Sequence, residues 1–120
     1  MPVQLSHISQ IAVTVTDLDR AAAFYQDKLG MKPLYRFSNL AFFDNGGIRL
    51  MLSPVEKDGD ARLASVIYYK VDDIHAAHHD LAGRGVAFEG PPHMIAKVEG
   101  REIWMAFFRD SEGNLMAIAT

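Results

Sequence analysis

The alternation of apolar and polar residues in the first half of the chain predicts a strand, a helix and three further strands. Residues 11–15 (IAVTV) alternate and are rich in β-branched side chains, as in a half-buried strand. Asp17 stands at the expected helix N-cap and Gly30 at the left-handed stop. Between them one buried helical face is predicted at Leu18, Ala22, Tyr25 and Leu29. Three short apolar runs follow, PLYRFS, LAFFD and IRLMLS, and the NGG between the last two predicts a hairpin.

The second half repeats this order of elements. Residues 64–71 (ASVIYYKV) predict a strand, Asp72 or Asp73 a helix N-cap, and the GRG at 83–85 the end of that helix. The inner face of the helix is predicted at Ile74, Ala77 and Leu81. Residues 86–98 predict an irregular strand region. The segments REIWMAFFRD, DSEGN and LMAIA then predict a long strand, a turn and a closing strand.

The two halves can be overlaid in register. Ile11–Val15 overlays Ile67–Val71 with a shift of 56 residues, and the same shift brings Asp17 onto Asp73. At the far end, GIRLML overlays GNLMAI with a shift of 66, because the second half has a longer strand region. The pattern therefore predicts an α+β fold made of two tandem βαβββ modules.

This duplication predicts how the chain is organised. A single domain over residues 1–120 is expected, with modules at about 8–54 and 63–120 joined by a polar linker at 55–62. One βαβββ unit is too small to cover both faces of its own sheet. Two units side by side are therefore expected to form curved mixed sheets around a shared cleft.

Composition narrows the class of protein. Apolar residues make up 49% of the chain and charged residues 22%, as in a soluble globular protein. The net charge is −3 and no Lys/Arg cluster stands out, so no nucleic-acid partner is expected. The chain has no cysteine, which excludes disulfides and thiolate chemistry. Neither a signal peptide nor a membrane-spanning run is visible, so we expect no membrane partner and a cytoplasmic location.

Three motifs carry a family resemblance. The helix segment TDLDRAAAFYQDKLG, the strand GGIRLML and the closing FFRDSEGNLMA resemble those of the vicinal oxygen chelate superfamily, which contains glyoxalases, bleomycin-resistance proteins and extradiol dioxygenases. The resemblance covers about Ser9 to Ala119. It implies the duplicated βαβββ fold, but it does not fix the activity, since one fold hosts many functions.

The resemblance also implies where a metal would be held. Metal-dependent members of the family bind a divalent ion through four side chains, usually His, Glu or Gln, from the first and last strands of each half. The matching positions here are Gln10, Met51, Val66 and Ala117, with Leu50 replacing Met51 if the register slips by one. Valine and alanine offer no donor, and a thioether does not suit hard cations. The sequence therefore predicts no metal and no other cofactor.

The histidines do not restore a metal site in the sequence. His7 precedes Gln10 by three residues, so strand alternation points it to the opposite face. His75 and His79 are four residues apart, a spacing that can clamp zinc, but they lie on the polar side of the predicted helix. His93 follows two prolines in the irregular region, where it can donate a hydrogen bond to a ligand.

Without a metal, the expected cleft is apolar and aromatic with a few polar groups, as in small-molecule pockets. Its predicted ligand-binding residues are Gln10, Arg49, Met51, Val66, Tyr68, His93, Trp104, Phe107 and Ala117. Arg49 either holds an anionic group of a ligand or forms a salt bridge at the sheet edge. The sequence does not determine which of four aromatic residues face the cleft, namely Phe43, Trp104, Phe107 and Phe108.

Two functions from different classes remain. The first is a metal-free protein that binds or sequesters an aromatic or amphiphilic small molecule, as bleomycin-resistance members do. The alternative is a metal-dependent lyase, epimerase or dioxygenase of the same superfamily with a rearranged metal site. A further alternative is a metal-free enzyme that uses Tyr68, Tyr69 or His93 as acid–base groups, although nothing in the sequence positions a second catalytic partner. Relatives of this length usually dimerise, so a homodimer is expected. A dimeric ferredoxin-like barrel leaves the duplicated strands unexplained.

Overall fold

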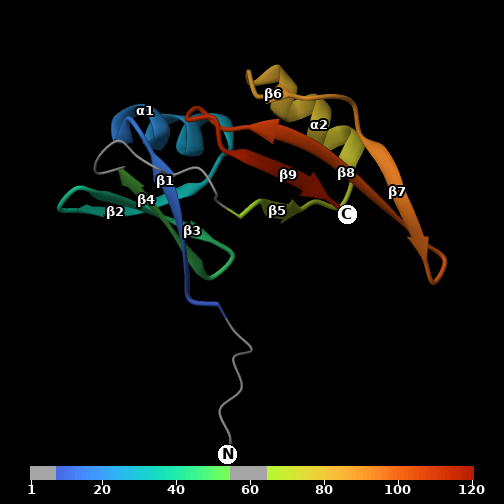
Figure 1. The fold of residues 1–120 in the computed structure, drawn as a ribbon, viewed down its shortest axis with the longest axis horizontal. Coiled ribbons are helices and arrows are strands. Elements are labelled where there is room, and N and C mark those ends of the chain that lie inside the picture. Colours follow the sequence, from blue (N-terminus) through green and yellow to red (C-terminus); the bar gives the residue numbers. More distant parts are fainter. Residues whose placement is uncertain (1–7, 55–64) are drawn as a thin grey trace, which may run out of the picture. The chain divides into compact units, whose positions relative to one another are not determined.

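The chain divides into two compact units, residues 1–63 and 64–120. The computed structural model describes residues 8–54 of the first unit and 65–120 of the second, drawn blue to green and yellow to red in Figure 1. The predicted linker at 55–62 and His7 lie outside the described residues. Each unit is a mixed sheet with helical segments, so the predicted α+β class is confirmed. The single domain and the shared cleft stay predictions.

The first unit forms one four-stranded sheet in the order β1-β4-β3-β2. Strands β1 and β4 are parallel, and the other two pairs are antiparallel. Its elements are β1 (Gln10–Val15), α1 (Leu18–Ala23), η1 (Phe24–Lys28), β2 (Lys32–Phe37), β3 (Leu40–Asn45) and β4 (Ile48–Pro54). This is the strand, helix and three strands expected from the sequence.

The helical segment begins and ends where its capping residues predict. The side chain of Asp17 accepts the backbone N–H of Arg20 at 3.0 Å, and Gly30 has a φ of 71°, in the left-handed region. The segment is not one regular helix, because a π-helical turn follows Ala23: the N–H of Leu29 bonds the carbonyl of Phe24, five residues back, at 3.1 Å. The extra residue brings a neighbouring position into the buried surface, so the core contains Phe24 as well as the predicted Tyr25.

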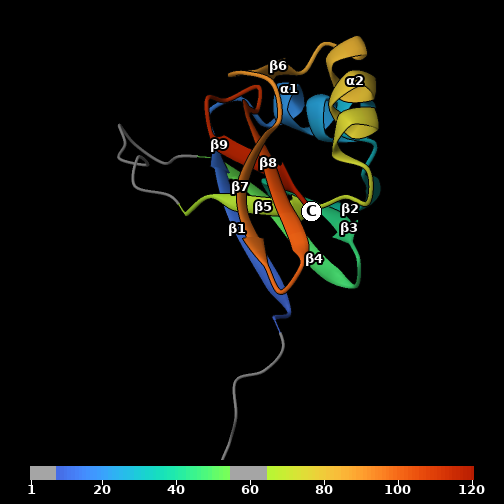
Figure 2. The same cartoon turned by 90° about the vertical axis from the view of Figure 1, so that its right-hand side faces the viewer.

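The second unit has the same topology with one additional short strand. Its sheet order is β5-β9-β8-β6, and β7 also pairs with β8, along which it runs in Figure 2. Strands β5 and β9 are parallel, as β1 and β4 are. The elements are β5 (Ile67–Lys70), α2 (Ile74–Gly83), β6 (Ala87–Phe88), β7 (His93–Val98), β8 (Arg101–Arg109) and β9 (Leu115–Ala119). The predicted irregular region is thus two short strands, both paired with β8.

Helix α2 is capped by Asp73 rather than Asp72. Its side chain accepts the backbone N–H of Ala76 at 3.1 Å. The corresponding residue of the first unit is Asp17, at the predicted shift of 56, so the cap is duplicated together with the strands. None of the helices in the described parts of the chain is long and apolar enough to span a bilayer.

Each sheet has one face covered by its own helix, which we call the helix-covered face. Helix α1 packs on β3 and β4, and α2 packs on β8 and β9. The buried strand residues that form these two cores are Val13, Val15, Ala41, Phe43, Leu50 and Leu52 in the first unit and Ala106, Phe108, Met116 and Ile118 in the second. Because strand side chains alternate, the residues between them lie on the other face, which we call the opposite face.

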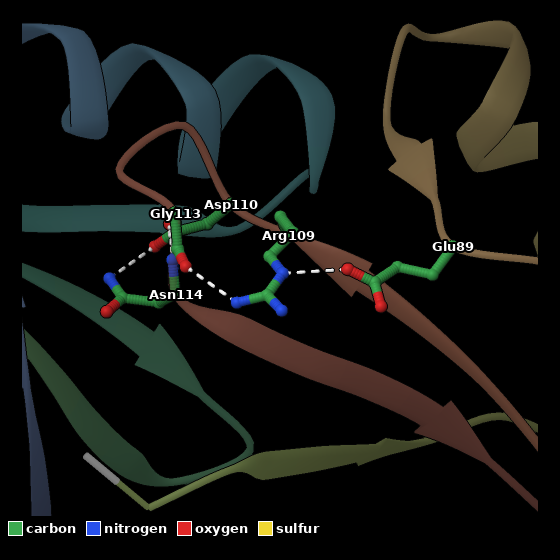
Figure 3. Close-up of polar contacts among 5 residues, drawn as sticks. All are labelled: Glu89, Arg109, Asp110, Gly113 and Asn114. Atoms are coloured by element: carbon green, nitrogen blue, oxygen red, sulfur yellow. Dashed lines mark hydrogen bonds and ion pairs between the residues drawn. The ribbon is translucent and has the colours of Figure 1, made fainter. Parts of the chain in front are cut away.

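A hydrogen-bonded turn joins β8 to β9 (Figure 3). Asp110 is 5% exposed, and its Oδ2 accepts the side-chain N–H of Asn114 at 2.9 Å. Arg109 donates from Nη1 to the carbonyl of Gly113 at 3.1 Å and pairs through Nε with Glu89 at 2.7 Å. Gly113 has a φ of 86°, which glycine adopts without strain. The turn fixes the register of the two strands that carry Phe107 and Ala117.

Candidate functional site

Strand register places three predicted site residues of the first unit on its opposite face. Gln10 is the cross-strand partner of Arg49, and Ala12 is that of Met51. Leu50 and Leu52, which flank Met51, are buried on the helix-covered face. Gln10, Arg49 and Met51 therefore lie together at one end of the β1–β4 pair, as the alternation predicts.

Arg49 is the centre of this group. Its Nε–H donates to Oε1 of Gln10 at 3.0 Å, and its Nη1 donates to the hydroxyl of Tyr35 at 3.4 Å. The guanidinium carbon lies 5.6 Å from the ring centroid of Phe42, within the range of a cation–π contact. Two of these partners are uncharged hydrogen-bond acceptors and the third is a ring. The guanidinium is thus held in place by neutral groups.

Aromatic rings form the base of the site. The ring of Phe42 is 7% exposed, and its centroid lies 4.8 Å from that of Tyr35, with 34° between the planes. Phe42 is the cross-strand partner of both Tyr35 and Met51, so all three share the opposite face. Tyr35 is 50% exposed, which leaves part of its ring accessible. We define the first-sheet cluster as Gln10, Tyr35, Phe42, Arg49 and Met51.

Sequence analysis missed two members of this cluster, Tyr35 and Phe42. The register of β2 against β3 shifts between Pro33 and Tyr35, so Leu34 is the extra residue of a β-bulge. A simple alternation along PLYRFS cannot reveal which residues change face at such a bulge. Phe42 was detectable, because it lies opposite Met51 across the hairpin that the NGG predicts.

The amide of Gln10 links Arg49 to Met51. Its Oε1 accepts from Arg49, and its Nε2 lies 3.7 Å from the sulfur of Met51, a weak acceptor. The amide oxygen is the only hard donor among the family-implied ligand positions, and a cationic guanidinium already occupies it. A divalent cation placed at this oxygen would be repelled by that charge.

The second unit brings together four other predicted site residues. Ala117 is the cross-strand partner of Tyr68 on one side and of Phe107 on the other. The rings of Tyr68 and Phe107 meet edge to face with centroids 6.0 Å apart. Val66 directly precedes β5. Because it is two residues from Tyr68, alternation places it on the same face as Tyr68. These four residues form an apolar and aromatic area on the opposite face of the second sheet.

His93 lies on the same face as this area but farther along the sheet. It is the cross-strand partner of Met105, which is two residues from Phe107 on β8. The side chain is exposed, and its Nδ1 lies 3.5 Å from the carbonyl oxygen of Pro91. The structure gives no contact between His93 and Tyr68 or Phe107.

Trp104 is separated from the other predicted site residues of its unit. It lies on the helix-covered face, where its ring meets that of His75 on α2 edge to face at 5.0 Å. Its indole N–H donates to Glu102 at 3.0 Å. All six residues from Ile103 to Phe108 are apolar, so the sequence offers no alternation from which to choose the face.

The structure also shows on which sheet face the other three aromatic residues lie. Phe43 packs against Tyr25 at 6.2 Å between ring centroids, and Phe108 packs against Phe88 at 5.5 Å. Both belong to the helix-covered cores. Phe107 is therefore the one member of the four that lies on an opposite face.

The side chains at the family-implied metal positions do not fit a hard divalent ion. Among residues 8–54 and 65–120, no group of three or more His, Cys, Asp or Glu side chains could hold a metal. Gln10 and Met51 contact each other, and Val66 and Ala117 contribute no donor atom. His75, one half of the potential zinc clamp with His79, is in ring contact with Trp104.

Tyr69 is removed from the acid–base candidates by its position. It is the cross-strand partner of Ile118 and therefore lies on the helix-covered face. Its hydroxyl lies 4.0 Å from the sulfur of the buried Met116. Burial, and to a lesser degree the negative charge of Asp110, raise the pKa of Tyr69 well above its usual value. The raised pKa makes the phenol a weaker acid, and its hydroxyl lies on the helix-covered side, away from the opposite face.

Comparison with known proteins agrees with this duplicated fold. The sequence model of the Glyoxalase/Bleomycin resistance protein/Dioxygenase superfamily matches residues 7–118. The protein YraH of Bacillus subtilis (strain 168), named as uncharacterized, is 31% identical over 124 residues, which cover 91% of this chain and 94% of that protein.

Solved structures share the fold at low sequence identity. An integron cassette protein from the mobile metagenome of V. cholerae is 23% identical with a TM-score of 0.78, over 100% of this chain and 98% of its own. Lactoylglutathione lyase from Agrobacterium tumefaciens is 22% identical with a TM-score of 0.73, over 95% of this chain and 92% of its own. The family match over nearly the whole sequence confirms the resemblance, and the chain belongs to the glyoxalase/bleomycin resistance protein/dioxygenase superfamily.

Proposed function

We propose that this protein binds a planar, aromatic small molecule without a metal ion, and that the first-sheet cluster is the binding surface. The observation that carries the proposal is the arrangement around Arg49, where a fixed guanidinium lies beside two aromatic rings that contact each other at a tilt. Such a mixture of apolar area and a few oriented polar groups is typical of small-molecule sites.

The aromatic members supply the contact area. Phe42 is a buried base, while the half-exposed ring of Tyr35 offers a surface on which a second ring can stack. An aromatic pair adds about 0.5–1.5 kcal/mol beyond the area that it buries. Met51 adds a polarizable wall beside Phe42, its cross-strand partner. These contacts select for flat ligands without requiring chemistry.

The polar members argue for binding without a metal. In metal-dependent relatives, as the family resemblance implies, the position of Gln10 would hold an ion. Here its amide oxygen accepts from Arg49 at 3.0 Å, and the other family-implied positions offer a thioether and two alkyl groups. A fixed positive charge thus lies where the family's ion would be expected. This favours a binding or sequestering role over the metal-dependent lyase, epimerase or dioxygenase chemistry of the superfamily.

NMR mapping tests the location of the site. Neutral aromatic amides, benzamide, 1-naphthamide and indole-3-acetamide, are titrated into isotopically labelled protein treated with a chelator. We expect saturable shifts of the amide signals of β1, β2, β3 and β4, centred on Tyr35, Phe42 and Arg49. Shifts confined to other elements would contradict the assignment of the site, and no saturable shift with any of the three would contradict aromatic binding itself.

Two variants at exposed positions, one beside the bulge of β2 and one in the bulge of β7, sharpen this test. Tyr35→Ala removes a ring of the cluster, and Ile95→Ala changes the bulge of β7 at a nearly equal exposure of 48% against 50%. We expect Tyr35→Ala to weaken amide binding about three- to tenfold, as loss of one aromatic contact predicts. Ile95→Ala should leave it unchanged. Equal effects of both variants would exclude Tyr35 from the site.

A further inference from the structure

We infer that the ligand of the first-sheet cluster is an aromatic oxyanion, a carboxylate or a phosphate ester, bound by the guanidinium of Arg49, and that Gln10 is the residue that orients this guanidinium. The inference rests on the proposed function and adds the charge of the ligand to it. It is carried by an arginine whose hydrogen bonds within the protein are made to neutral groups.

The pairing of Arg49 differs from that of three other arginines. Arg36, Arg84 and Arg109 each lie within hydrogen-bond distance of a carboxylate, at 3.0, 2.9 and 2.7 Å. The structure gives Arg49 no such ion pair within residues 8–54 and 65–120. Its positive charge is therefore not neutralised by direct contact with an acidic side chain in the described parts of the chain. An anionic ligand can supply the missing partner.

The acidic residue across the strand from Arg49 bonds the hairpin instead. Asp44 is the cross-strand partner of Arg49, but its Oδ1 accepts the backbone N–H of Gly47 at 3.3 Å in the β3–β4 hairpin. Arg49 instead extends toward β1 and β2, where Gln10 and Tyr35 accept its hydrogen bonds. The carboxylate that could have closed an ion pair thus stabilises the turn.

Arg49 retains donors for a ligand. A guanidinium has five N–H groups, and the two hydrogen bonds to Gln10 and Tyr35 use one each, which leaves three on Nη1 and Nη2. Three donors in one plane are sufficient for a two-point contact with a carboxylate or a phosphate. The adjacent half-exposed Tyr35 gives an aromatic ring attached to that anion a surface on which to stack.

Gln10 fixes this arrangement without cancelling the charge. Its carbonyl oxygen holds Nε of Arg49 at 3.0 Å, and its amide nitrogen is directed at the sulfur of Met51 at 3.7 Å. A glutamate at the same position would have nearly the same shape but would form an ion pair with Arg49. The neutral amide therefore orients the guanidinium and leaves its charge available. Gln10 is a positioning residue, which acts through Arg49.

Matched pairs of probes test the charge of the ligand. Benzoate, 1-naphthoate and indole-3-acetate are compared by calorimetry with benzamide, 1-naphthamide and indole-3-acetamide, in chelator-treated protein. A charge-assisted contact predicts that the acid of at least one pair binds about ten- to a hundredfold more tightly than its amide. Equal affinities in every pair would overturn this inference and leave the proposed function standing. No binding of either member in any pair would overturn both.

Further arms separate the two kinds of oxyanion. 1-Naphthyl phosphate is compared with 1-naphthoate, and inorganic phosphate and acetate are titrated alone. Tighter binding of the phosphate ester assigns a phosphorylated ligand, and tighter binding of the naphthoate assigns a carboxylic acid. Binding of inorganic phosphate as strong as that of both naphthyl compounds would show an anion site without aromatic selectivity, which contradicts the inference.

The variant Gln10→Glu provides the decisive control. It should abolish the preference for the acid over the amide, because the new carboxylate pairs with Arg49. Arg49→Gln should remove the same preference without creating an ion pair. Arg36→Gln removes the same charge from the helix-covered side, where Arg36 pairs with Asp19, and should retain the preference. An unchanged acid preference in Gln10→Glu would overturn the role of Gln10.

Discussion

The Nε–H of Arg49 donates a hydrogen bond to Oε1 of Gln10 at 3.0 Å, between neighbouring parallel strands of the first sheet. This hydrogen bond joins two residues that a sequence comparison would treat separately. One is a position at which relatives in the family would hold a metal ion, and the other is a cation supplied by the chain itself. The first-sheet cluster is built around that bond, and its expected properties follow from it.

Binding of aromatic acids should weaken as salt is added. The contact between an exposed guanidinium and an anion is screened over a Debye length of about 10 Å at 0.1 M ionic strength. Calorimetry of 1-naphthoate at increasing sodium chloride concentration measures this effect, and 1-naphthamide is the matched neutral probe. We expect a falling affinity for the acid and a nearly constant affinity for the amide. Parallel curves would show that Arg49 does not contact the anion.

Stability at alkaline pH should depend on Tyr69. Its pKa in the folded protein is raised above the usual value of 10.0 by burial and by Asp110, so unfolded chains lose the phenolic proton first as the pH rises. The stabilisation is complete below pH 10.0 and is lost as the pH rises toward the folded-state pKa. Urea unfolding between about pH 8 and 11 measures it. Tyr69→Phe should lose less stability over this range than the wild type, whereas Tyr68→Phe should follow the wild type.

The cap of helix α2 can be tested by two neighbouring aspartates. Asp73 accepts the backbone N–H of Ala76, so Asp73→Ala should lower the free energy of unfolding by about 1 kcal/mol. Asp72→Ala is the control, because Asp72 is exposed and is not the capping residue. Denaturant unfolding of both variants measures the difference. A larger effect at Asp72 would contradict the assignment of the cap.

The turn between β8 and β9 should be sensitive to loss of its buried carboxylate. Asp110 accepts the backbone N–H groups of Glu112 and Asn114, each at 2.8 Å, and is 5% exposed. Asp110→Ala leaves these donors unsatisfied, and we expect a loss of about 1–3 kcal/mol in the free energy of unfolding. Asp110→Asn retains an acceptor oxygen and should lose less. Equal losses in both variants would assign the effect to the charge instead.

The sequence was sufficient for the fold because its local signals agree with one another. Asp17 and Asp73 cap the two helices at positions related by the predicted shift, and Gly30 ends the first helical segment in the left-handed conformation. The parallel pairing of first and last strands is likewise repeated in both units. The π-helical turn after Ala23 departs from the expected element, because no capping or periodic signal marks an inserted residue.

The candidate site was less accessible to sequence analysis. The face of Gln10, Arg49 and Met51 follows from alternation, because buried leucines flank Met51 on its strand. Tyr35 depends on a bulge at Leu34 that alternation cannot foresee. The sequence does not reveal the face of Trp104, because its strand is apolar on both faces, and its contact with His75 depends on the packing of α2 on the sheet.

Calorimetry of 1-naphthoate with and without divalent ions tests the central claim most directly. The protein is treated with a chelator, dialysed, and titrated alone and then in the presence of zinc, manganese or nickel. Because Arg49 occupies the oxygen of Gln10, we predict saturable binding in the chelated protein and an affinity that none of the three ions changes by more than twofold. Binding that appears only after one of these ions is added would contradict the account.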